Sequence, residues 1–551
     1  MQQRTTAGTV GWPADFATRY LAGGYWEGRP LLSYVQAAAE ADPDAVCLVD
    51  GDVRLTYREL MSRVDGAGAR LHGLGLRPDD RVLVQLPNCW QFLVMVLACL
   101  RVGVLPVLML QGHRKQEITL VAEHAEARAI ITTGSVKGFD HQALAHEIAA
   151  ESTTLEHVLV AAEDLDGRSV DLAAVCQPSD DPAPVVEEPA GTAVAIFVLS
   201  GGSTGAPKLI ARTHNDFSYM VRRAAQICGV GHDTVYLTAL PLGHGFPFTG
   251  ALGALFYGGR VVIAPSPAPE RAFALIEAER VTMTSLVPAI AQRWLDHRAA
   301  DPTRDISSLA LVQVSGSRIP DEMARRMNPV LGCELQNGYG MGEGLMCLTR
   351  PGDPHDVVCG TQGRPICPDD ELRLVDEQGA PVADGEAGIL LTRGPYTPRG
   401  YYRAAQANAR AFDSAGWYNT GDIVRLRPDG YLVVEGRQKD VINRGGEKIS
   451  AEEIENFAYQ SGASLAAAVA MPDPELGERI CLYVVGGRLE LAELCDTMRA
   501  AGVATFKLPE RLVRAKSLPV TAVGKIDKGA LRADIAGRLA GEREPTERQA
   551  G

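Results

Sequence analysis

The sequence predicts a multi-domain α/β protein, and three observations lead to that expectation. At 551 residues the chain exceeds the size of a single ordinary core, so at least two domains are expected. Short runs rich in β-branched residues alternate with helical stretches, as at 80–86, 127–133 and 259–265. The 57 glycines and 33 prolines indicate many loops between short elements.

The segment 90–110, WQFLVMVLACLRVGVLPVLML, is apolar and long enough to suggest a membrane span. Arg101, Gly103 and Pro106 interrupt it near its middle and end. We therefore predict a buried helix, a turn and a buried strand, and no membrane association.

Composition narrows the class of protein further. The formal net charge of −14 argues against nucleic-acid binding, which requires a basic face. The 11 cysteines are scattered, with no CxxC pair and no Cys/His spacing of a metal site. Because the amino terminus lacks an apolar signal core, we expect a cytoplasmic enzyme with reduced thiols.

The stretch 198–209, VLSGGSTGAPKL, has the composition of a phosphate-binding loop. Its glycines expose backbone N–H groups, its hydroxyl residues add donors and Lys208 adds charge, although the GxxxxGK[ST] pattern is absent. We expect the loop to join two strands, and Asn215 or Asp216 to cap the helix that follows. A glycine-rich surface turn is the alternative.

Near the carboxyl end, Pro428, Asp429 and Gly430 separate two strand-like runs within 422–437, which predicts a hairpin. A polar, glycine-containing segment then leads into a helix. We therefore place a large amino-terminal domain at 1–437 and a small carboxy-terminal domain at 440–551, with a hinge near 438–439.

Five short motifs occur in an order that resembles the adenylate-forming superfamily. They are SGGSTGAPK (200–208), GYGMGEG (338–344), YNTGD (418–422), GRQKDVINRGGEK (436–448) and TAVGK (521–525). The segments LLTRGPYTPRGYYRA (390–404) and INRGGEKISAEEIEN (442–456) further resemble free-standing aryl-acid-AMP ligases, such as the 2,3-dihydroxybenzoate-AMP ligases of nonribosomal peptide assembly lines. The resemblance implies an adenylation domain of three subdomains and a small, mobile α+β lid.

The resemblance also implies the roles of individual residues toward ATP and Mg²⁺. Glu343 would hold Mg²⁺, Asp422 would accept hydrogen bonds from the ribose, and Lys525 would contact the reacting carboxylate and the α-phosphate. His244 would lie near the substrate carboxylate, which completes the catalytic set of Lys525, His244 and Glu343. The residues implied for ATP binding are Ser200, Gly201, Gly202, Ser203, Thr204, Gly205, Lys208, Gly316, Ser317, Arg318, Tyr339, Gly340, Asp422 and Arg437.

A second half-reaction follows from the same resemblance. Lys439 would be the hinge about which the lid rotates, withdrawing Lys525 and bringing Gly445 and Gly446 to the path of a pantetheine thiol. Since no carrier domain is recognised after the lid, we expect a separate aryl carrier protein to accept the acyl group in trans. Two alternatives stay open: a coenzyme A ligase or luciferase-like enzyme, and a degenerate nucleotide-binding or scaffolding protein.

The expected acid pocket departs from the family. Its residues would be His244, Gly245, Phe246, Gly316, Gly338 and Met341. Hydroxybenzoate ligases usually carry asparagine at the position of Gly245 and often valine at that of Gly338, so two glycines suggest an enlarged pocket. We therefore expect a bicyclic acid such as quinoxaline-2-carboxylate or a hydroxyquinaldate. If neighbouring side chains refill the space, the substrate would be 2,3-dihydroxybenzoate, salicylate or 3-hydroxyanthranilate.

Overall fold

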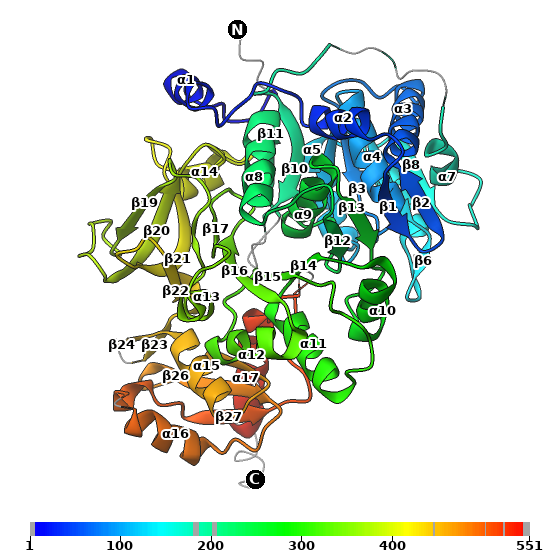
Figure 1. Ribbon diagram of the computed structural model, residues 1–551. Coiled ribbons are helices and arrows are strands. Elements are labelled where there is room, and N and C mark those ends of the chain that lie inside the picture. Colours follow the sequence, from blue (N-terminus) through cyan, green and yellow to red (C-terminus); the bar gives the residue numbers. More distant parts are fainter. Residues whose placement is uncertain are drawn as a thin grey trace, which may run out of the picture.

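The structure is a computed structural model that describes residues 6–179, 184, 187–200, 207–444, 447–501, 503–521 and 524–543. Within these residues, the strands form four sheets of four or more strands, and helices pack around them (Figure 1). Three of these sheets come from the first 437 residues and the fourth from the carboxy-terminal part. The predicted α/β fold with several domains is confirmed.

The largest sheet carries parallel strands at its centre and antiparallel strands at both edges. Its strand order is β18-β17-β16-β15-β14-β12-β13-β1-β2. The bounds are β1 (Val46–Asp50), β2 (Val53–Thr56), β12 (Val235–Thr238), β13 (Arg260–Ile263), β14 (Met283–Leu286), β15 (Leu311–Val314), β16 (Glu334–Gly340), β17 (Met346–Leu348) and β18 (Arg364–Pro365). The carboxyl ends of parallel strands are where ligands bind in such sheets.

The second sheet has the order β11-β10-β4-β3-β5-β8-β9. Its strands are β3 (Arg81–Val84), β4 (Leu105–Leu108), β5 (Ala129–Thr133), β8 (His157–Ala161), β9 (Val170–Asp171), β10 (Val194–Leu199) and β11 (Leu209–Thr213). Because β10 and β11 pair as antiparallel neighbours, the prediction that the glycine-rich loop joins two strands is confirmed.

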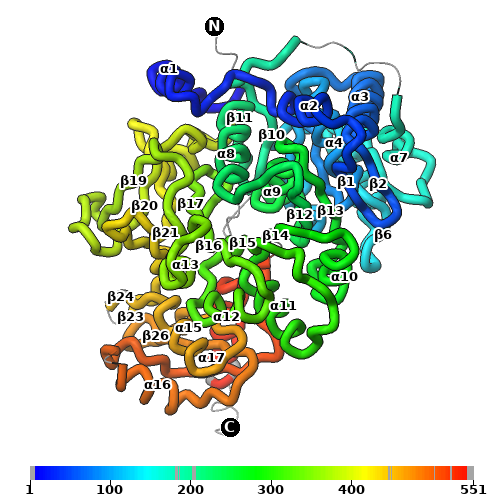
Figure 2. Tube along the Cα trace, in the orientation of Figure 1, coloured from blue at the N-terminus to red at the C-terminus, as the bar shows by residue number. Residues whose placement is uncertain are grey.

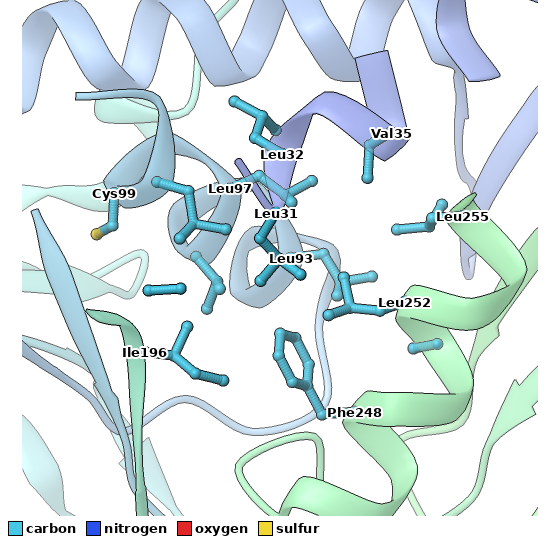
Figure 3. Packing of buried hydrophobic residues seen from close by; sticks show 14 of the residues in the cluster. Leu31, Leu32, Val35, Leu93, Leu97, Cys99, Ile196, Phe248, Leu252 and Leu255 are labelled. Atoms are coloured by element: carbon cyan, nitrogen blue, oxygen red, sulfur yellow. The ribbon is translucent and has the colours of Figure 1, made fainter. Parts of the chain in front are cut away.

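A shared core lies between these two sheets. Figure 3 shows Leu93 and Leu97 of α4 (Trp90–Arg101) close to Phe248 and Leu252 of α9 (Gly245–Phe256), with Leu32 of α2 (Leu32–Ala41) beside them. All of these side chains are buried. The core therefore fixes α9, whose first residue, Gly245, belongs to the expected acid pocket.

The apolar segment 90–110 folds as predicted, since α4 is followed by a turn and the buried strand β4. Among the described residues, no helix has both the length and the apolar character that a membrane span requires. Packing inside the protein thus accounts for the hydrophobicity of this segment.

Helix α8 (His214–Ile227) starts earlier than expected. Thr213 is its N-cap, and its hydroxyl accepts a hydrogen bond from the backbone N–H of Asp216. Asp216 is the third helical residue, and its carboxylate lies 2.7 Å from Nε of Arg212 in a buried ion pair. The prediction that Asn215 or Asp216 caps the helix is wrong, because Thr213 and Asp216 form a reciprocal capping box.

The third sheet contains β19 (Glu371–Val375), β20 (Ala387–Arg393), β21 (Tyr418–Leu426) and β22 (Leu432–Arg437). Strands β21 and β22 form the predicted hairpin. A single 3-10 turn, η1 (Gln438–Asp440), separates this sheet from the next. The division expected at 438–439 falls within that turn.

The carboxy-terminal part, which we call the lid, begins after η1, and its described residues form a sheet and three α-helices. Figure 2 shows it in orange to red, and its helix α15 packs against α12 of the large domain. The lid elements are β23 (Ile442–Arg444), β24 (Glu447–Ile449), α15 (Ala451–Gln460), β25 (Leu465–Asp473), β26 (Gly477–Val485), α16 (Leu491–Ala500), η2 (Thr505–Lys507), β27 (Arg511–Arg514) and α17 (Lys528–Arg543).

The other elements of the large domain surround its sheets. They are α1 (Ala14–Ala22), α3 (Tyr57–Gly73), α5 (Lys115–Ala125), β6 (Ser135–Val136), β7 (Phe139–Asp140), α6 (His141–Glu151), α7 (Leu172–Val175), α10 (Pro269–Glu279), α11 (Pro288–Ala300), α12 (Asp321–Leu331), α13 (His355–Gly360) and α14 (Ala405–Ala411).

Candidate active site

A cavity of about 220 Å³ lies between the lid and the large domain. Of the residues expected to bind ATP, it brings together Gly316, Ser317, Arg318, Tyr339, Gly340, Asp422 and Arg437. Lys439 of the expected hinge and Lys525 of the lid also line it. Residues from five distant segments of the chain therefore meet around one space.

Asp422 is the central polar residue of the large-domain side. It is only 3% exposed, and the hydroxyl of Tyr339 donates to its Oδ2 at 2.6 Å. Nε of Arg437 lies 2.7 Å from its Oδ1, across the β21–β22 pair. The backbone N–H of Asp422 donates to Oγ1 of Thr420 at 3.0 Å. These contacts hold the carboxylate in one orientation at the cavity wall.

Tyr339 shares this environment. Burial, together with the charge of Asp422, raises the pKa of Tyr339 well above its usual range. The phenol therefore stays protonated and remains a hydrogen-bond donor to the carboxylate. The short bond fixes the ring beside Gly340, and both residues are among those expected to bind ATP.

Lys525 reaches from the lid to the large domain. A Cβ built on Gly316 would lie 3.6 Å from Cε of Lys525, so the lysine stem passes close to that backbone. Gly316 has φ +92°, a conformation that favours glycine. Lys525 lies in the loop that precedes α17, not within the helix. The lid thus has the position in which this lysine can contact a ligand in the cavity.

The surroundings of Lys525 disfavour its positive charge. Burial and the charge of Arg437 lower the pKa of Lys525 to about 8, while Asp422 and Glu343 act in the opposite direction. An anionic ligand in the cavity would raise this pKa again, because opposite charge favours the ammonium form.

Glu343 follows β16 in a turn and is 7% exposed. The hydroxyl of Tyr401 donates to its Oε1 at 2.8 Å, and Tyr418 lies 3.3 Å from that hydroxyl, oxygen to oxygen. Nζ of Lys208 lies 5.2 Å from the centre of the Tyr401 ring. Glu343 and Lys208, predicted from separate motifs, are therefore held around one tyrosine.

The donor set fits Mg²⁺ bound largely through a nucleotide. Within the described residues, no group of three or more histidine, cysteine, aspartate or glutamate side chains could hold a metal ion. Mg²⁺ in nucleotide enzymes usually takes one or two carboxylates and completes its shell with phosphate oxygens and water. Glu343 suits that arrangement, since its carboxylate is buried and oriented by Tyr401.

The ends of the glycine-rich loop are held together. Oγ of Ser200 accepts from the backbone N–H of Lys208 at 3.1 Å, and the backbone N–H of Ser200 donates to the carbonyl of Lys208 at 2.9 Å. Seven predicted site residues, five of this loop and two of the lid, lie outside the described residues: Gly201, Gly202, Ser203, Thr204, Gly205, Gly445 and Gly446.

His244 is the N-cap of α9, and its Nδ1 accepts from the backbone N–H of Phe246 at 3.3 Å. Burial, with a smaller contribution from the charge of Lys525, lowers the pKa of His244 to about 4. The ring is therefore neutral near pH 7, and its proton resides on Nε2, since Nδ1 is an acceptor.

The expected acid pocket is only partly joined to the cavity. Gly316 and Gly338 line the cavity, whereas the described residues place His244, Gly245, Phe246 and Met341 outside its lining. Lys525 is common to the two regions. It lines the cavity, and its positive charge contributes to the lowered pKa of His244.

The two glycines of the expected pocket differ in their surroundings. Among the described residues, a Cβ built on Gly245 would meet no atom within 4 Å. A Cβ on Gly338 would lie 2.9 Å from Cδ2 of Leu348, its partner across the β16–β17 pair. The expectation that Gly338 enlarges the pocket is therefore wrong, because Leu348 already fills that space.

Several residues of the site had no role in the sequence prediction. Tyr401 and Tyr418 lie within quoted motifs, yet nothing in their local pattern indicates a contact with Glu343. The lid side of the cavity is formed mainly by charged and polar side chains of α15 and α17: Glu452, Glu455, Asn456, Tyr459, Lys528 and Arg532.

A family model described as AMP-binding enzyme matches residues 35–402, and the chain belongs to that family. It is thus an enzyme of the acid-ligase class, as the motifs implied. A 2-hydroxy-7-methoxy-5-methyl-1-naphthoate--CoA ligase from Streptomyces carzinostaticus is 59% identical over 546 residues, covering 97% of this chain and 98% of the relative.

Two further relatives are named for monocyclic acids. A salicylyl-CoA synthase / salicylate adenylyltransferase from a Streptomyces species is 51% identical, covering 97% and 99% of the two chains. A 2,3-dihydroxybenzoate-AMP ligase from Bacillus subtilis is 44% identical, covering 97% and 98%. The solved apo structure of MbtA from Mycobacterium smegmatis has 44% identity and a TM-score of 0.75, covering 96% and 99%. The resemblance to aryl-acid-AMP ligases is confirmed.

Proposed function

We propose that this protein activates a bicyclic aromatic carboxylic acid with ATP and passes the acyl group to a pantetheine thiol. Gly245 carries the proposal: a Cβ there would meet no described atom within 4 Å, at a position where hydroxybenzoate ligases usually carry asparagine, and we assign the second ring to that space. The relative named for a substituted naphthoate supports the same size class. Since naphthoate is bicyclic without a ring nitrogen, a carbocyclic acid is better supported than the quinoxaline or quinaldate expected from the sequence.

In the first half-reaction a carboxylate oxygen of the acid attacks the α-phosphorus of ATP, and pyrophosphate leaves. Both reactants are anionic, so their approach requires neutralisation of charge and fixed orientation. Lys525 supplies a cation at the junction of the lid and the large domain. Nε2–H of neutral His244 is a donor suited to the substrate carboxylate.

The other residues position the nucleotide. Asp422, oriented by Tyr339 and Arg437, accepts hydrogen bonds from the two ribose hydroxyls. Glu343 would hold Mg²⁺, which neutralises phosphate charge when bound. Lys208, fixed at the base of the glycine-rich loop, lies on the same side as Glu343.

In the second half-reaction a thiol attacks the carbonyl carbon of the acyl adenylate, and AMP leaves. Two pantetheine thiols are candidates. Coenzyme A is favoured because the relatives with 59% and 51% identity are named as a CoA ligase and a CoA synthase. The aryl carrier protein expected from the sequence is the second candidate, because the chain also resembles the AMP ligases of assembly lines.

The test is ATP–pyrophosphate exchange with a matched set of acids: 2-hydroxy-1-naphthoate, quinoxaline-2-carboxylate, salicylate and 2,3-dihydroxybenzoate. We expect the highest kcat/KM with the naphthoate. A clear preference for 2,3-dihydroxybenzoate would refute the proposed substrate class. Product analysis with coenzyme A and with a phosphopantetheinylated carrier protein then identifies the acceptor.

A further inference from the structure

A hydrogen bond joins the lid to the large domain next to the cavity. Oγ of Ser450, directly before α15, donates to the backbone carbonyl of Glu435 on β22 at 2.6 Å. Val434 and Arg437 of the same strand line the cavity. The turn η1, which contains the expected hinge, lies between the two bonded residues in the chain. A rotation of the lid at 438–439 would therefore break this bond.

The accepting carbonyl belongs to a β-bulge. Along β22 the residues paired with β21 run from Val434 directly to Gly436, so Glu435 is the extra residue. The extra residue of a bulge is left unpaired in the ladder, and β22 is the last strand of its sheet. Gly436 has φ +144°, which favours glycine, and a Cβ built on it would lie 3.6 Å from Oγ of Ser450. The bulge thus presents its carbonyl to the lid.

The residues around the bulge form one wall of the candidate active site. Arg437 follows the bulge and lies 2.7 Å from Oδ1 of Asp422, measured from its Nε. Val434 precedes the bulge, and its carbonyl accepts from Nη1 of Arg318 at 2.8 Å. All four of these residues line the cavity. Ser450 is therefore bonded to the strand segment that positions the residues expected to bind the nucleotide.

Ser450 has a second role inside the lid. It is the N-cap of α15, and its Oγ accepts from the backbone N–H of Glu453 at 3.4 Å. A hydroxyl offers one donor and two acceptor positions, so this contact and the bond to Glu435 coexist. Helix α15 packs against β22 and α12 of the large domain. One hydroxyl thus begins the docking helix and attaches it to the large domain.

We propose that Ser450 is a positioning residue whose hydroxyl stabilises the lid position in which Lys525 enters the active site. The inference rests on the proposed two-step reaction, in which the lid leaves this position before the thiol attacks. Since the bond to Glu435 spans the expected hinge, it stabilises this position and is lost in a rotated one. Ser450 thereby favours adenylation over transfer.

Three substitutions of Ser450 separate docking from helix capping. Ser450→Ala removes the donor and the N-cap, whereas Ser450→Thr keeps both. Ser450→Asp keeps a favourable N-cap acceptor but has no hydrogen to donate to the carbonyl. Ser517→Ala, at an exposed position of the lid, is the control.

The two half-reactions are measured separately in these variants. We expect Ser450→Ala and Ser450→Asp to lower kcat/KM for the acid in ATP–pyrophosphate exchange about fivefold, the factor that corresponds to a typical neutral hydrogen bond. Ser450→Thr and Ser517→Ala should match wild type, and transfer from a supplied acyl adenylate should not fall in any variant. Wild-type activity in Ser450→Asp would show that only capping matters and would overturn the proposal, as would equal loss of both half-reactions.

A measurement without any acid substrate separates this inference from the proposed function. With ATP and Mg²⁺ bound, backbone hydrogen–deuterium exchange over 432–437 reports whether the lid covers β22. We expect faster deuterium uptake there in Ser450→Asp, which keeps the cap of α15, and wild-type uptake in Ser450→Thr. Unchanged uptake in Ser450→Asp would refute a role in lid position. A wrong substrate class would instead appear as failure of the wild type to activate bicyclic acids, while the difference in deuterium uptake persists.

Discussion

Nε of Arg437 lies 2.7 Å from Oδ1 of Asp422, and the two residues face each other across the β21–β22 pair. The other carboxylate oxygen accepts from Tyr339 at 2.6 Å. A carboxylate fixed on both oxygens is oriented before the nucleotide arrives. Its remaining lone pairs are the acceptors available for two adjacent hydroxyl groups.

Replacement of Asp422 tests this arrangement. Asp422→Ala removes the ribose acceptor and leaves Arg437 and Tyr339 without their partner, so kcat/KM for ATP should fall about 100-fold or more. Steady-state ATP–pyrophosphate exchange measures the effect. Asp429→Asn, an exposed carboxylate in the turn of the same hairpin, should behave as wild type. A fall of less than threefold for Asp422→Ala would exclude direct contact with the nucleotide.

Lys525 should matter for only one half-reaction. Lys525→Ala removes the cation that the lid places in the cavity, so exchange should become undetectable. Transfer from a supplied acyl adenylate to the thiol should persist, because the lid has then withdrawn this residue. Lys516→Ala, at an exposed lid position, is the control. Comparable loss of both steps would contradict a lid that works in two positions.

Tyr401 orients Glu343, so its hydroxyl should influence metal affinity. In Tyr401→Phe the carboxylate loses the 2.8 Å bond, and the Mg²⁺ concentration that gives half-maximal exchange should rise about tenfold. Tyr431→Phe also removes a tyrosine-to-carboxylate bond, to Asp353, but away from Glu343. If both variants, or neither, change the Mg²⁺ requirement, the role given to Tyr401 is wrong.

Asp370 should make stability depend on pH. Burial raises its pKa to about 8, and Tyr396 donates to its Oδ2 at 2.5 Å. Between about pH 4 and pH 8 the folded protein therefore keeps a proton that the unfolded chain releases. The resulting stabilisation is complete below pH 4 and is lost as pH rises to 8.

Asp370→Asn should accordingly reduce the fall in Tm between pH 5 and pH 8 relative to wild type. Asp384→Asn, at an exposed position, should leave that fall unchanged. Differential scanning calorimetry at the two pH values measures both. An undiminished fall in Asp370→Asn would mean that Asp370 is ionised in the folded protein at pH 5.

Local patterns predicted the elements that depend on local physics. The turn signal at Pro428 to Gly430 gave the β21–β22 hairpin, and the interruption of the segment 90–110 gave α4 and β4. The start of α8 was predicted too late, because Asn215 and Asp216 are also residue types that favour the N-cap position. The ion pair between Arg212 and Asp216 is visible only in the structure.

Contacts between distant segments could not be predicted. Tyr401 and Glu343 are 58 residues apart, and no periodicity connects them. The error at Gly338 has the same origin, because its space is filled by Leu348 through pairing of β16 with β17. At Gly245, by contrast, a Cβ would meet no described atom within 4 Å, and the enlarged pocket expected there stays a prediction.

Gly245 is therefore the position at which the substrate class can be tested most directly. Gly245→Asn places an amide where the structure leaves room and returns the residue usual in hydroxybenzoate ligases. The measurement is the ratio of kcat/KM for 2-hydroxy-1-naphthoate to that for salicylate, in ATP–pyrophosphate exchange, for wild type and variant. We predict a ratio well above one in the wild type that falls at least tenfold in Gly245→Asn. A wild-type ratio below one, or a ratio that the substitution leaves unchanged, would contradict the account.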